Sequence, residues 1–556
     1  MRLWSCCCWK SVLAAAVTAL MVVRVAGEKT DQAAGNQHRR PNVVIFLLDD
    51  NGWGDAGIND NSVTETPYKL AEQGLTFSDF HAAASVCTPS RAGLLTGRTA
   101  ARTGVYGNFE PASLYGLPTG EKTLANYLQE AGYDTHMIGK WHLGVQPGYH
   151  PTYRGFNTFY GLPYSGDMGC IESTPQGCEP SWLRNESQPA CPALCSAVDG
   201  TRATSPAVPL YDTQGPDCEA AQNKTCDETI VQQPYNPLAL NGQYTARAIE
   251  LIQGFGTDPF FLYVAYAHTH TPLAYDPMFA NASTREGRAQ VFGNTLAEVD
   301  ASVGAIVRAL DVAGLLEDTL ILLSADNGPA NLGSVACEAV GSPGPFTGEW
   351  QRASNGGQGG ATLKSTAWEG AAVWKSVIAS GTNTSVLAST LDYVPTILSL
   401  ANISLPQDRM FDGVDLSTLL LDGQAPFDER ILFFPEDGNM AAMRFNEYKL
   451  FYKTRGVEPC IGSPEPRTAG RALTHDPPLI FNVTDDPQES RPITLMGSEL
   501  DYVLSLWHGY WDSVKGTMRS QTNYSTGDAS AWPCCNRESH SCSCTDPVKT
   551  TSAGLS

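Results

Sequence analysis

Short apolar runs that alternate with helical patterns occupy the sequence from about residue 40 to about residue 425. The clearest runs are rich in β-branched and aromatic side chains, which favour strands, and they cover residues 43–48, 134–138, 260–265 and 319–324. Amphipathic periodicity predicts helices at residues 121–131, 244–253, 291–312 and 386–400. Strands that alternate with helices form a largely parallel sheet covered on both faces. We therefore predict an α/β fold with a large mixed, mostly parallel sheet sandwiched by helices.

The pattern changes near residue 430. Shorter strand-like pieces at residues 431–434, 440–444 and 449–452 suit a small antiparallel sheet packed on the main domain, and a cysteine-rich tail ends the chain. We expect a main domain at residues 41–429 and a smaller C-terminal α+β subdomain at residues 430–556. A Pro-, Ser- and Cys-rich stretch at residues 170–235 is interpreted as a disulfide-stapled insertion.

The N-terminal segment has the features of a signal peptide. Basic residues precede an apolar stretch at residues 12–23, and small residues follow at residues 25–27, which predicts a signal peptide at residues 1–27 and a linker at residues 28–40. A signal anchor is the alternative, but the apolar core is shorter than the ~20 residues that span a bilayer. No later apolar run reaches that length, so we expect no stable membrane insertion. Secretory passage also suits the glycosylation sequons at Asn185, Asn223, Asn281, Asn383, Asn402, Asn482 and Asn523.

Cysteine counting singles out one residue. The chain has 16 cysteines, of which three lie in the signal segment, leaving an odd number in an oxidising compartment where cysteines tend to pair. The remainder fall into a group of six in the insertion, a group of four in the tail, an isolated pair, and Cys87. From counting alone, Cys87 is either an inert buried thiol, an intermolecular bridge or a functional residue.

The net charge bears on partners. A formal charge of −22 repels polyanions at long range, so nucleic acid is not expected as a partner. A small anionic substrate stays compatible with this charge, because local cations and a metal ion can dominate inside a cleft.

Polar clusters follow each of the four predicted strands at the same end. Asp49 and Asp50 follow the first strand, Lys140 and His142 the second, His268 and His270 the third, and Asp326 and Asn327 the fourth. Any one cluster could be ordinary turn chemistry. Four such clusters at the carboxyl edge of one parallel sheet are harder to explain as turns, because this edge is where such sheets bind ligands.

The residues of these clusters that offer oxygen ligands predict a metal site. Asp49, Asp50, Asp326 and Asn327 offer only oxygen ligands, which suit a hard divalent cation, and calcium fits them better than zinc. The two histidines leave zinc as an alternative, but neither a thiolate nor a third histidine lies near them in sequence.

The segment from Cys87 to Arg98 carries the strongest signal. Thr88 can cap a helix with Pro89 at its first position, which would place residue 87 at a helix N-terminus, where an anion is favoured. An ordinary capped helix with an incidental cysteine is the alternative. The run Cys87-Thr88-Pro89-Ser90-Arg91 resembles the CxPxR signature of the sulfatase family, in which the cysteine is oxidised to formylglycine before folding.

The resemblance extends over nearly the whole mature chain and is strongest to the arylsulfatase A group. Its landmarks include the Gly139–Gly144 block, residues 161–165, 268–270 and 325–329, and the double-cysteine tail. It implies an alkaline-phosphatase-like sulfatase fold, hydrolysis of sulfate monoesters, one calcium ion and a formylglycine derived from Cys87. It also implies the formylglycine-generating enzyme as a partner during biosynthesis, and a secreted or lysosomal location.

Site roles carry over at the matching positions. The resemblance implies that Asp49, Asp50, Asp326 and Asn327 bind calcium together with the modified residue 87. It implies that Arg91 holds the hydrated aldehyde and that His142 is the base that collapses the covalent intermediate. The groups it places around the sulfate are Lys140, Ser165, His270 and Lys364. His270 is preferred to His268 because of its spacing to Pro272.

Substrate choice and assembly stay open at this point. After Gly370 the family usually has a glycine, a hydrophobic residue and an arginine, whereas this chain continues with residues 371–375, Ala-Ala-Val-Trp-Lys. A sulfated small molecule, glycolipid or polysaccharide could be the substrate, and a homo-oligomer is compatible with the sequence. The alternative functions are a phosphoesterase on the related fold and a catalytically silent extracellular structural or glycan-binding glycoprotein.

Overall fold

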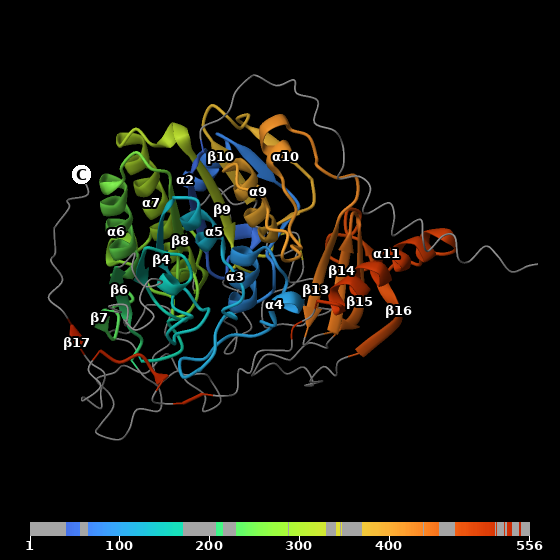
Figure 1. Cartoon of the computed structure of the whole chain (residues 1–556), viewed down its shortest axis with the longest axis horizontal. Coiled ribbons are helices and arrows are strands. Elements are labelled where there is room, and N and C mark those ends of the chain that lie inside the picture. The colour runs from blue at the N-terminus through green and yellow to red at the C-terminus, as the bar shows by residue number, and fades with distance from the viewer. Residues whose placement is uncertain are drawn as a thin grey trace, which may run out of the picture. The chain divides into compact units, whose positions relative to one another are not determined.

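The computed structural model shows a large mixed β-sheet with helices on both faces (Figure 1). Within the described part of the chain this sheet has 11 strands, in the order β11-β2-β10-β9-β1-β8-β4-β5-β6-β7-β17. The described residues are 40–55, 65–170, 207–214, 229–286, 288–329, 341–344, 346, 370–436, 439–454, 473–517, 519, 527–528, 531–535 and 544–545. The predicted signal peptide and most of the predicted insertion lie outside them.

Five neighbouring strands in the middle of the sheet are parallel. They run in the order β9-β1-β8-β4-β5. Their bounds are Thr319–Ala325, Asn42–Leu48, Phe260–Ala265, Asp134–Gly139 and Thr158–Gly161. Each of the four predicted strands is therefore present, with its ends displaced by at most one residue.

The strands outside this centre make the sheet mixed. On one side β10 (Gly370–Trp374) runs antiparallel to both β9 and β2 (Leu75–Phe77), and β11 (Thr382–Thr384) is parallel to β2. On the other side β6 (Leu210–Gln214), β7 (Ile230–Gln233) and β17 (Cys544–Thr545) pair antiparallel. These antiparallel strands lie on either side of the parallel centre. The carboxyl edge of that centre carries the loops that follow the four predicted strands.

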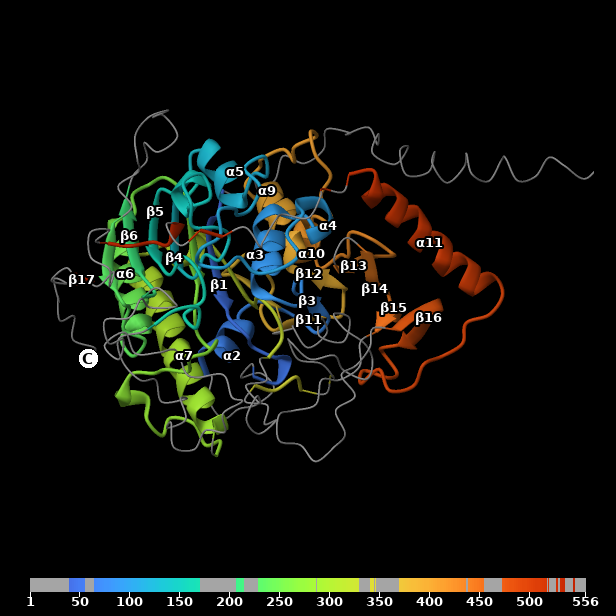
Figure 2. The same ribbon diagram turned by 90° about the horizontal axis from the view of Figure 1, so that it is seen from below.

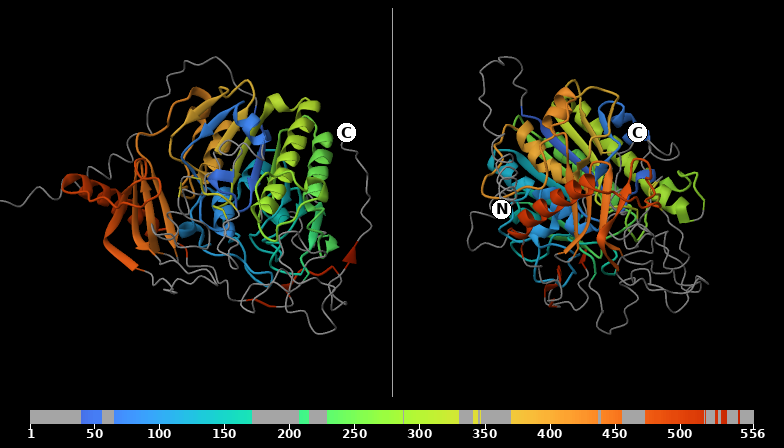
Figure 3. Two further views of the ribbon diagram at one scale, coloured as in Figure 1. Left: turned by 180° about the vertical axis from the view of Figure 1, so that it is seen from behind. Right: turned by 90° about the vertical axis from the view of Figure 1, so that its right-hand side faces the viewer.

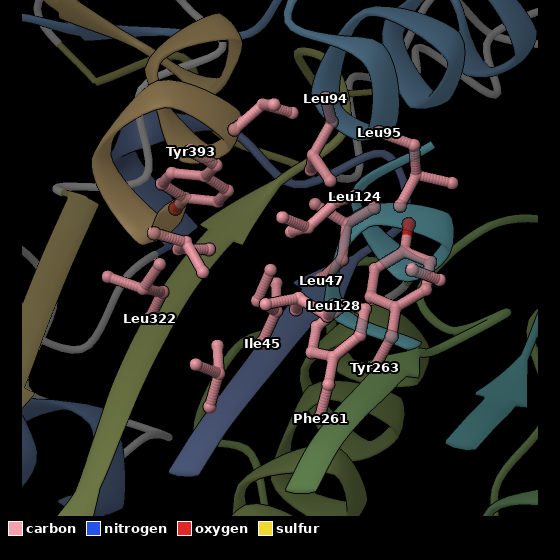
Figure 4. Close-up of a cluster of buried hydrophobic side chains, with 14 of the residues drawn as sticks. Ile45, Leu47, Leu94, Leu95, Leu124, Leu128, Phe261, Tyr263, Leu322 and Tyr393 are labelled. Atoms are coloured by element: carbon pink, nitrogen blue, oxygen red, sulfur yellow. The ribbon is translucent and has the colours of Figure 1, made fainter. Parts of the chain in front are cut away.

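Alternate side chains of β1 face two separate hydrophobic clusters. Val43, Ile45 and Leu47 point to one face, and the even-numbered residues point to the other. The odd-numbered face packs against α3 (Cys87–Thr96), α5 (Leu124–Glu130) and α9 (Tyr393–Leu400). Figure 4 shows Ile45 and Leu47 of β1 among side chains of these helices and of β8 and β9.

The even-numbered face packs against α2 (Glu65–Ala71), α6 (Leu240–Gly254) and α7 (Arg288–Val312), of which α6 and α7 lie side by side (Figure 3). All seven residues of β1 are buried, because helices cover it on both sides. This is why the strand reads as a continuous apolar run.

Two predicted helices begin later than expected. The helix predicted at residues 121–131 begins at Leu124, because Thr123 and Asn126 form a capping box at its start. The helix predicted at residues 386–400 is wrong over its first residues. Ser389 lies in the extended conformation and caps a 3₁₀ turn, Thr390–Asp392, and the α-helix begins at Tyr393.

A second, smaller sheet forms near the C-terminus. It is antiparallel, in the order β13-β14-β15-β16, and its strands are Ile431–Glu436, Asn439–Phe445, Tyr448–Thr454 and Leu473–Asn482. The helix α11 (Ser498–Lys515) buries Val503 and Trp507 against one face, and Figure 2 shows it alongside these strands. Leu387 of the main domain packs against the other face. The predicted fold class is thus confirmed in both its parts.

The described cysteines agree with the separation of Cys87 from the others. Cys170, Cys534 and Cys535 are disulfide-bonded, and among the described residues Cys87 is free and buried. None of the helices that the structure describes combines the length and the apolar character required to cross a bilayer.

Candidate active site

The loops that follow β9, β1, β8 and β4 meet at one edge of the sheet. Backbone hydrogen bonds continue the strand pairing into the loops: Asp49 N donates to His268 O at 3.0 Å, Asp326 N to Leu48 O at 2.9 Å, and Lys140 N to Ala265 O at 2.7 Å. The side chains of these loops are therefore carried by rigid backbone. The convergence expected from the sequence is present.

Cys87 enters this edge from the first turn of α3. The expectation that Thr88 caps the helix is wrong, because the helix begins at Cys87 itself and extended Val86 precedes it. The Thr88 hydroxyl instead donates to His142 O at 2.7 Å, and its backbone N–H is taken by Asn108 Oδ1 at 3.0 Å. The Thr88 hydroxyl thus bonds the carbonyl of His142 in another loop instead of capping its own helix.

Three carboxylates and one amide gather beside Cys87, all of them 0 to 1% exposed. Asp50 N donates to Asp326 Oδ1 at 3.3 Å, and Asn327 Nδ2 donates to Asp50 Oδ1 at 2.6 Å. Cys87 Sγ lies 3.6 Å from Asp49 Oδ1. The structure thus brings together all five residues that the sequence suggested as metal ligands.

Two buried cations share the space with these carboxylates. Arg91 binds Asp326 through Nε at 2.9 Å and Asp49 through its NH2 nitrogen at 3.2 Å. Lys140 Nζ lies 2.6 Å from Asp49 Oδ2, 3.4 Å from Cys87 Sγ and 3.4 Å from Ser165 Oγ. Lys140 therefore stands between residue 87 and Ser165.

The carboxylates respond differently to this environment. Burial alone would raise the pKa of Asp49, but Lys140 and Arg91 together hold it below the ordinary value. Burial, together with the neighbouring carboxylate of Asp49, raises the pKa of Asp50 to about 6 and that of Asp326 to about 7. Asp50 and Asp326 therefore hold their protons more readily than exposed aspartates do, because both are desolvated and lie beside Asp49.

Two acceptor oxygens in this group fit an additional cation. Asp50 Oδ2 and Asn327 Oδ1 are buried and accept no hydrogen bond. Buried acceptors without donors are costly unless a cation or water meets them. Candidate ligand atoms of Asp49, Asp50, Cys87 and His270 all lie within 4.8 Å of one another. The oxygen-rich set suits a hard divalent ion.

His142 has a buried, neutral ring that interacts electrostatically with Lys140 and Arg91 of the site. Its side chain is 1% exposed and neither ring nitrogen has a hydrogen-bond partner. Burial, reinforced by Lys140 and Arg91, lowers its pKa well below the ordinary value. A neutral imidazole with a free nitrogen can accept a proton.

His270 differs in both contacts and charge. Its Nδ1 lies 2.7 Å from Thr271 O and 3.4 Å from Ser165 Oγ, and its Nε2 lies 3.5 Å from Asp50 Oδ2. Burial alone would lower the pKa of His270, but the Asp50 carboxylate outweighs this effect and raises it. Protonated His270 can therefore donate a proton to a bound group.

His268 and Lys364 remain outside this arrangement for different reasons. His268 belongs to the backbone pairing between the loops, its Nδ1 has no partner, and burial lowers its pKa to about 4. The structure brings His270 rather than His268 beside Ser165 and Asp50. Lys364 lies outside the described residues.

Sequence reasoning missed two contacts that hold the loops. One is the Thr88 bond to His142. The other is Asn51, whose Nδ2 donates to Thr269 Oγ1 at 2.7 Å and to Asp49 O at 3.2 Å, and which fastens the loop after β1 to the loop after β8. Asn51 follows two aspartates and precedes glycine, so its local sequence indicates only a turn.

Comparison with known proteins identifies the family. Residues 41–403 match the family described as Sulfatase, and residues 428–544 match the C-terminal region of aryl-sulfatase. Arylsulfatase G of Homo sapiens is 40% identical over 91% of this chain and 93% of its own length. Arylsulfatase A of Homo sapiens is 37% identical over 81% of this chain and 83% of its own length.

Solved structures agree in fold. The PsFucS1 sulfatase from Pseudoalteromonas sp. matches with a TM-score of 0.68 at 24% identity, over 88% of this chain and 92% of that chain. BT4656, in complex with its substrate D-glucosamine-2-N,6-O-disulfate, matches with a TM-score of 0.55 at 15% identity, over 87% of this chain and 100% of that chain. Taken together with the extent of the family match, these likenesses lead to one conclusion: the chain belongs to the sulfatase family, hydrolases that act on sulfuric esters.

Proposed function

We propose that this protein hydrolyses sulfate monoesters with a formylglycine made from Cys87, beside a calcium ion. The observation that carries the proposal is the position of Cys87, free and fully buried at the start of α3, between Lys140 and three carboxylates. Burial raises the pKa of its thiol well above the ordinary value, so an unmodified thiol here would be a poor nucleophile. Conversion to an aldehyde hydrate supplies the hydroxyl nucleophile and, through its second hydroxyl, a route to release sulfate.

Calcium is the ion that the surrounding ligands suit. Asp49, Asp50, Asp326 and Asn327 supply oxygen atoms, and the modified residue 87 would complete the set. When bound, the ion would stabilise negative charge on the sulfate and on the attacking oxygen. Arg91 bridges Asp49 and Asp326, so the role that its contacts support is to fix these carboxylates beside residue 87.

Lys140 and Ser165 are proposed to bind the sulfate. Lys140 Nζ lies 3.4 Å both from Sγ of residue 87 and from Ser165 Oγ, so one ammonium can contact the nucleophile and an oxygen of the bound ester. Its burial strengthens this attraction, because a fixed charge in a dry site needs no solvent reorganisation. Lys364 is proposed for the same task from the family resemblance.

The two histidines divide the proton transfers. Neutral His142 is proposed to accept a proton from a hydroxyl of the residue 87 hydrate, which allows sulfate to leave as the aldehyde re-forms. His270, whose pKa is raised by Asp50, is proposed to donate a proton to the leaving oxygen of the ester. Opposite shifts of two neighbouring histidines are the pattern expected for a base and an acid.

A sulfated sugar is the substrate class that we propose. BT4656 was solved with a sulfated glucosamine, and a relative from Mus musculus, 31% identical, is an N-acetylgalactosamine-6-sulfatase. We further propose maturation in the secretory pathway by the formylglycine-generating enzyme, followed by delivery to the lysosome or the exterior.

The test compares variants of residue 87 in secreted, purified protein. Cys87→Ala and Cys87→Ser are assayed against an aryl sulfate and against O-sulfated glucosamine and galactosamine. Both variants are expected to lose turnover and to keep wild-type secretion, because neither can form the aldehyde at this position. The matched control is Thr96→Ser, a buried change on the same helix that keeps the hydroxyl bonded to Ala92 O and should keep turnover. Full turnover by Cys87→Ala would refute the proposal.

A further inference from the structure

We propose that Thr88 is a positioning residue, whose hydroxyl fixes the backbone of His142 and thereby the direction in which the His142 ring points. The inference rests on the proposed function, because it assigns the proton acceptor to His142. Thr88 itself need not touch substrate. It would act through the loop that follows β4.

The bond between the two residues is buried and short. Thr88 is 0% exposed, and its Oγ1 donates to His142 O at 2.7 Å across 54 positions of sequence. The backbone N–H of Thr88 is occupied by Asn108 Oδ1. Thr88 is thus anchored at the start of α3, and its hydroxyl is committed to the carbonyl of His142.

The backbone of His142 is in an unusual conformation. Its φ is +61°, in the left-handed region, which costs energy for any residue with a Cβ, although histidine adopts it more often than most. Its N–H donates to Pro163 O at 3.0 Å, and its carbonyl receives the Thr88 hydroxyl. These two bonds hold both sides of a strained residue.

The His142 ring depends on this backbone. Both ring nitrogens lack hydrogen-bond partners, so no side-chain bond fixes the ring. Without the Thr88 hydroxyl, the buried carbonyl of His142 would be left unpaired, and rotation of the peptide out of the left-handed region is the natural relief. That rotation would turn the ring away from residue 87.

The contacts on either side of His142 do not use Thr88. Arg91 donates through its NH1 nitrogen to Lys140 O at 2.6 Å, and Trp141 Nε1 donates to Tyr149 O at 2.9 Å. Lys140, which is placed to hold the sulfate, therefore keeps its anchor when the Thr88 hydroxyl is removed. The inference predicts a loss in turnover without a loss in substrate binding.

The experiment uses Thr88→Val, which removes the hydroxyl at nearly constant volume, and Thr88→Ser, which keeps it. The matched control is Thr96→Val on the same helix, where an equally buried hydroxyl bonds within the helix to Ala92 O at 2.7 Å. Formylglycine per chain is measured by peptide mass spectrometry for each protein, and kcat is expressed per formylglycine.

We expect Thr88→Val to lower kcat by about 10- to 100-fold without raising KM, and KM should fall with kcat if breakdown of the sulfated intermediate limits turnover. Thr88→Ser should restore most of the turnover, and Thr96→Val should retain it. Wild-type kcat in Thr88→Val, a change confined to KM, or equal losses in Thr88→Val and Thr88→Ser would overturn the inference. So would a loss that disappears when kcat is expressed per formylglycine, which would assign Thr88 to maturation instead.

A stability role for the Thr88 hydroxyl is tested with a smaller variant, Thr88→Ala, made in parallel. If neither variant lacking the hydroxyl folds while Thr88→Ser does, the hydroxyl serves stability and the positioning role is wrong. A wild-type protein without formylglycine and without turnover would refute the proposed function itself, whereas an active Thr88→Val protein refutes only this inference.

Discussion

Glu298 makes the stability of this protein depend on pH in a direction that can be measured. It lies on α7, is 5% exposed, and accepts a hydrogen bond from Asp276 N at 3.2 Å. Its pKa is raised to about 8, chiefly by burial and also by the charge of Asp276, while the hydrogen bond opposes the shift. The folded protein therefore holds a proton on Glu298 at a pH where the unfolded chain has released it.

The sign follows from this difference in bound protons. Below pH 4.5, the ordinary pKa of Glu298, both states hold the proton and no stability is lost. From there to about pH 8 only the folded state holds it, so the free energy of unfolding falls by about 1.4 kcal/mol for each pH unit. The full loss is on the order of 5 kcal/mol, reached at about pH 8.

Glu298→Gln tests this directly. The amide cannot ionise and its oxygen can still accept from Asp276 N. Urea unfolding at pH 5, 6, 7 and 8 should show the variant gaining stability over wild type as the pH rises, with the two nearly equal at pH 5. Glu250→Gln, which changes a glutamate with a 70% exposed side chain on α6, is the control and should show no such trend. A constant difference between Glu298→Gln and wild type at every pH would refute the reasoning.

Three other changes should have separate effects. Asp326→Asn should lower bound calcium per chain, measured by elemental analysis, because it removes one of the three carboxylates; calcium equal to wild type would contradict the ligand set. Gly139→Ala should prevent accumulation of folded protein, because φ is +107° and a Cβ would lie 1.8 Å from Ala265 O, and normal secretion would contradict this steric argument. Asp392→Ala should cost about 3 to 5 kcal/mol in thermal unfolding, because it leaves Arg430 unpaired; the NH1 nitrogen of Arg430 lies 2.7 Å from Asp392 in a buried pair that ties the turn before α9 to the start of β13. An unchanged Tm would show that the pair is not needed.

The central strands could be predicted closely because burial on both faces leaves a plain signal. β8 has the predicted bounds, Phe260–Ala265, and all six of its residues are buried. Helix starts were harder to predict, because contacts with distant parts of the chain can decide whether a residue joins the helix. Ser389 could have begun a helix by its type, yet it lies in an extended segment paired with β3 (Phe80–His81), and tertiary pairing overrides the local preference.

The same contrast holds for the candidate site: the sequence predicts the residues that follow the strands but not the contacts that hold the loops together. The pairs Asp49–Asp50 and Asp326–Asn327, which offer oxygen ligands, follow strands whose order in the sheet brings them together, so strand ends and residue types suffice to predict the group. The bonds of Thr88 to His142 and of Asn51 to Thr269 join residues 54 and 218 positions apart. A side-chain hydroxyl or amide can form hydrogen bonds with several nearby groups, and only the packing of the folded chain decides which one it uses.

Peptide mass spectrometry across residue 87 of the secreted protein tests the central claim most directly. The account predicts that most chains carry an aldehyde, or its hydrate, at this position and that carbonyl-reactive hydrazide labels the same peptide. A free thiol or a disulfide at residue 87 in protein that hydrolyses sulfate esters would contradict it.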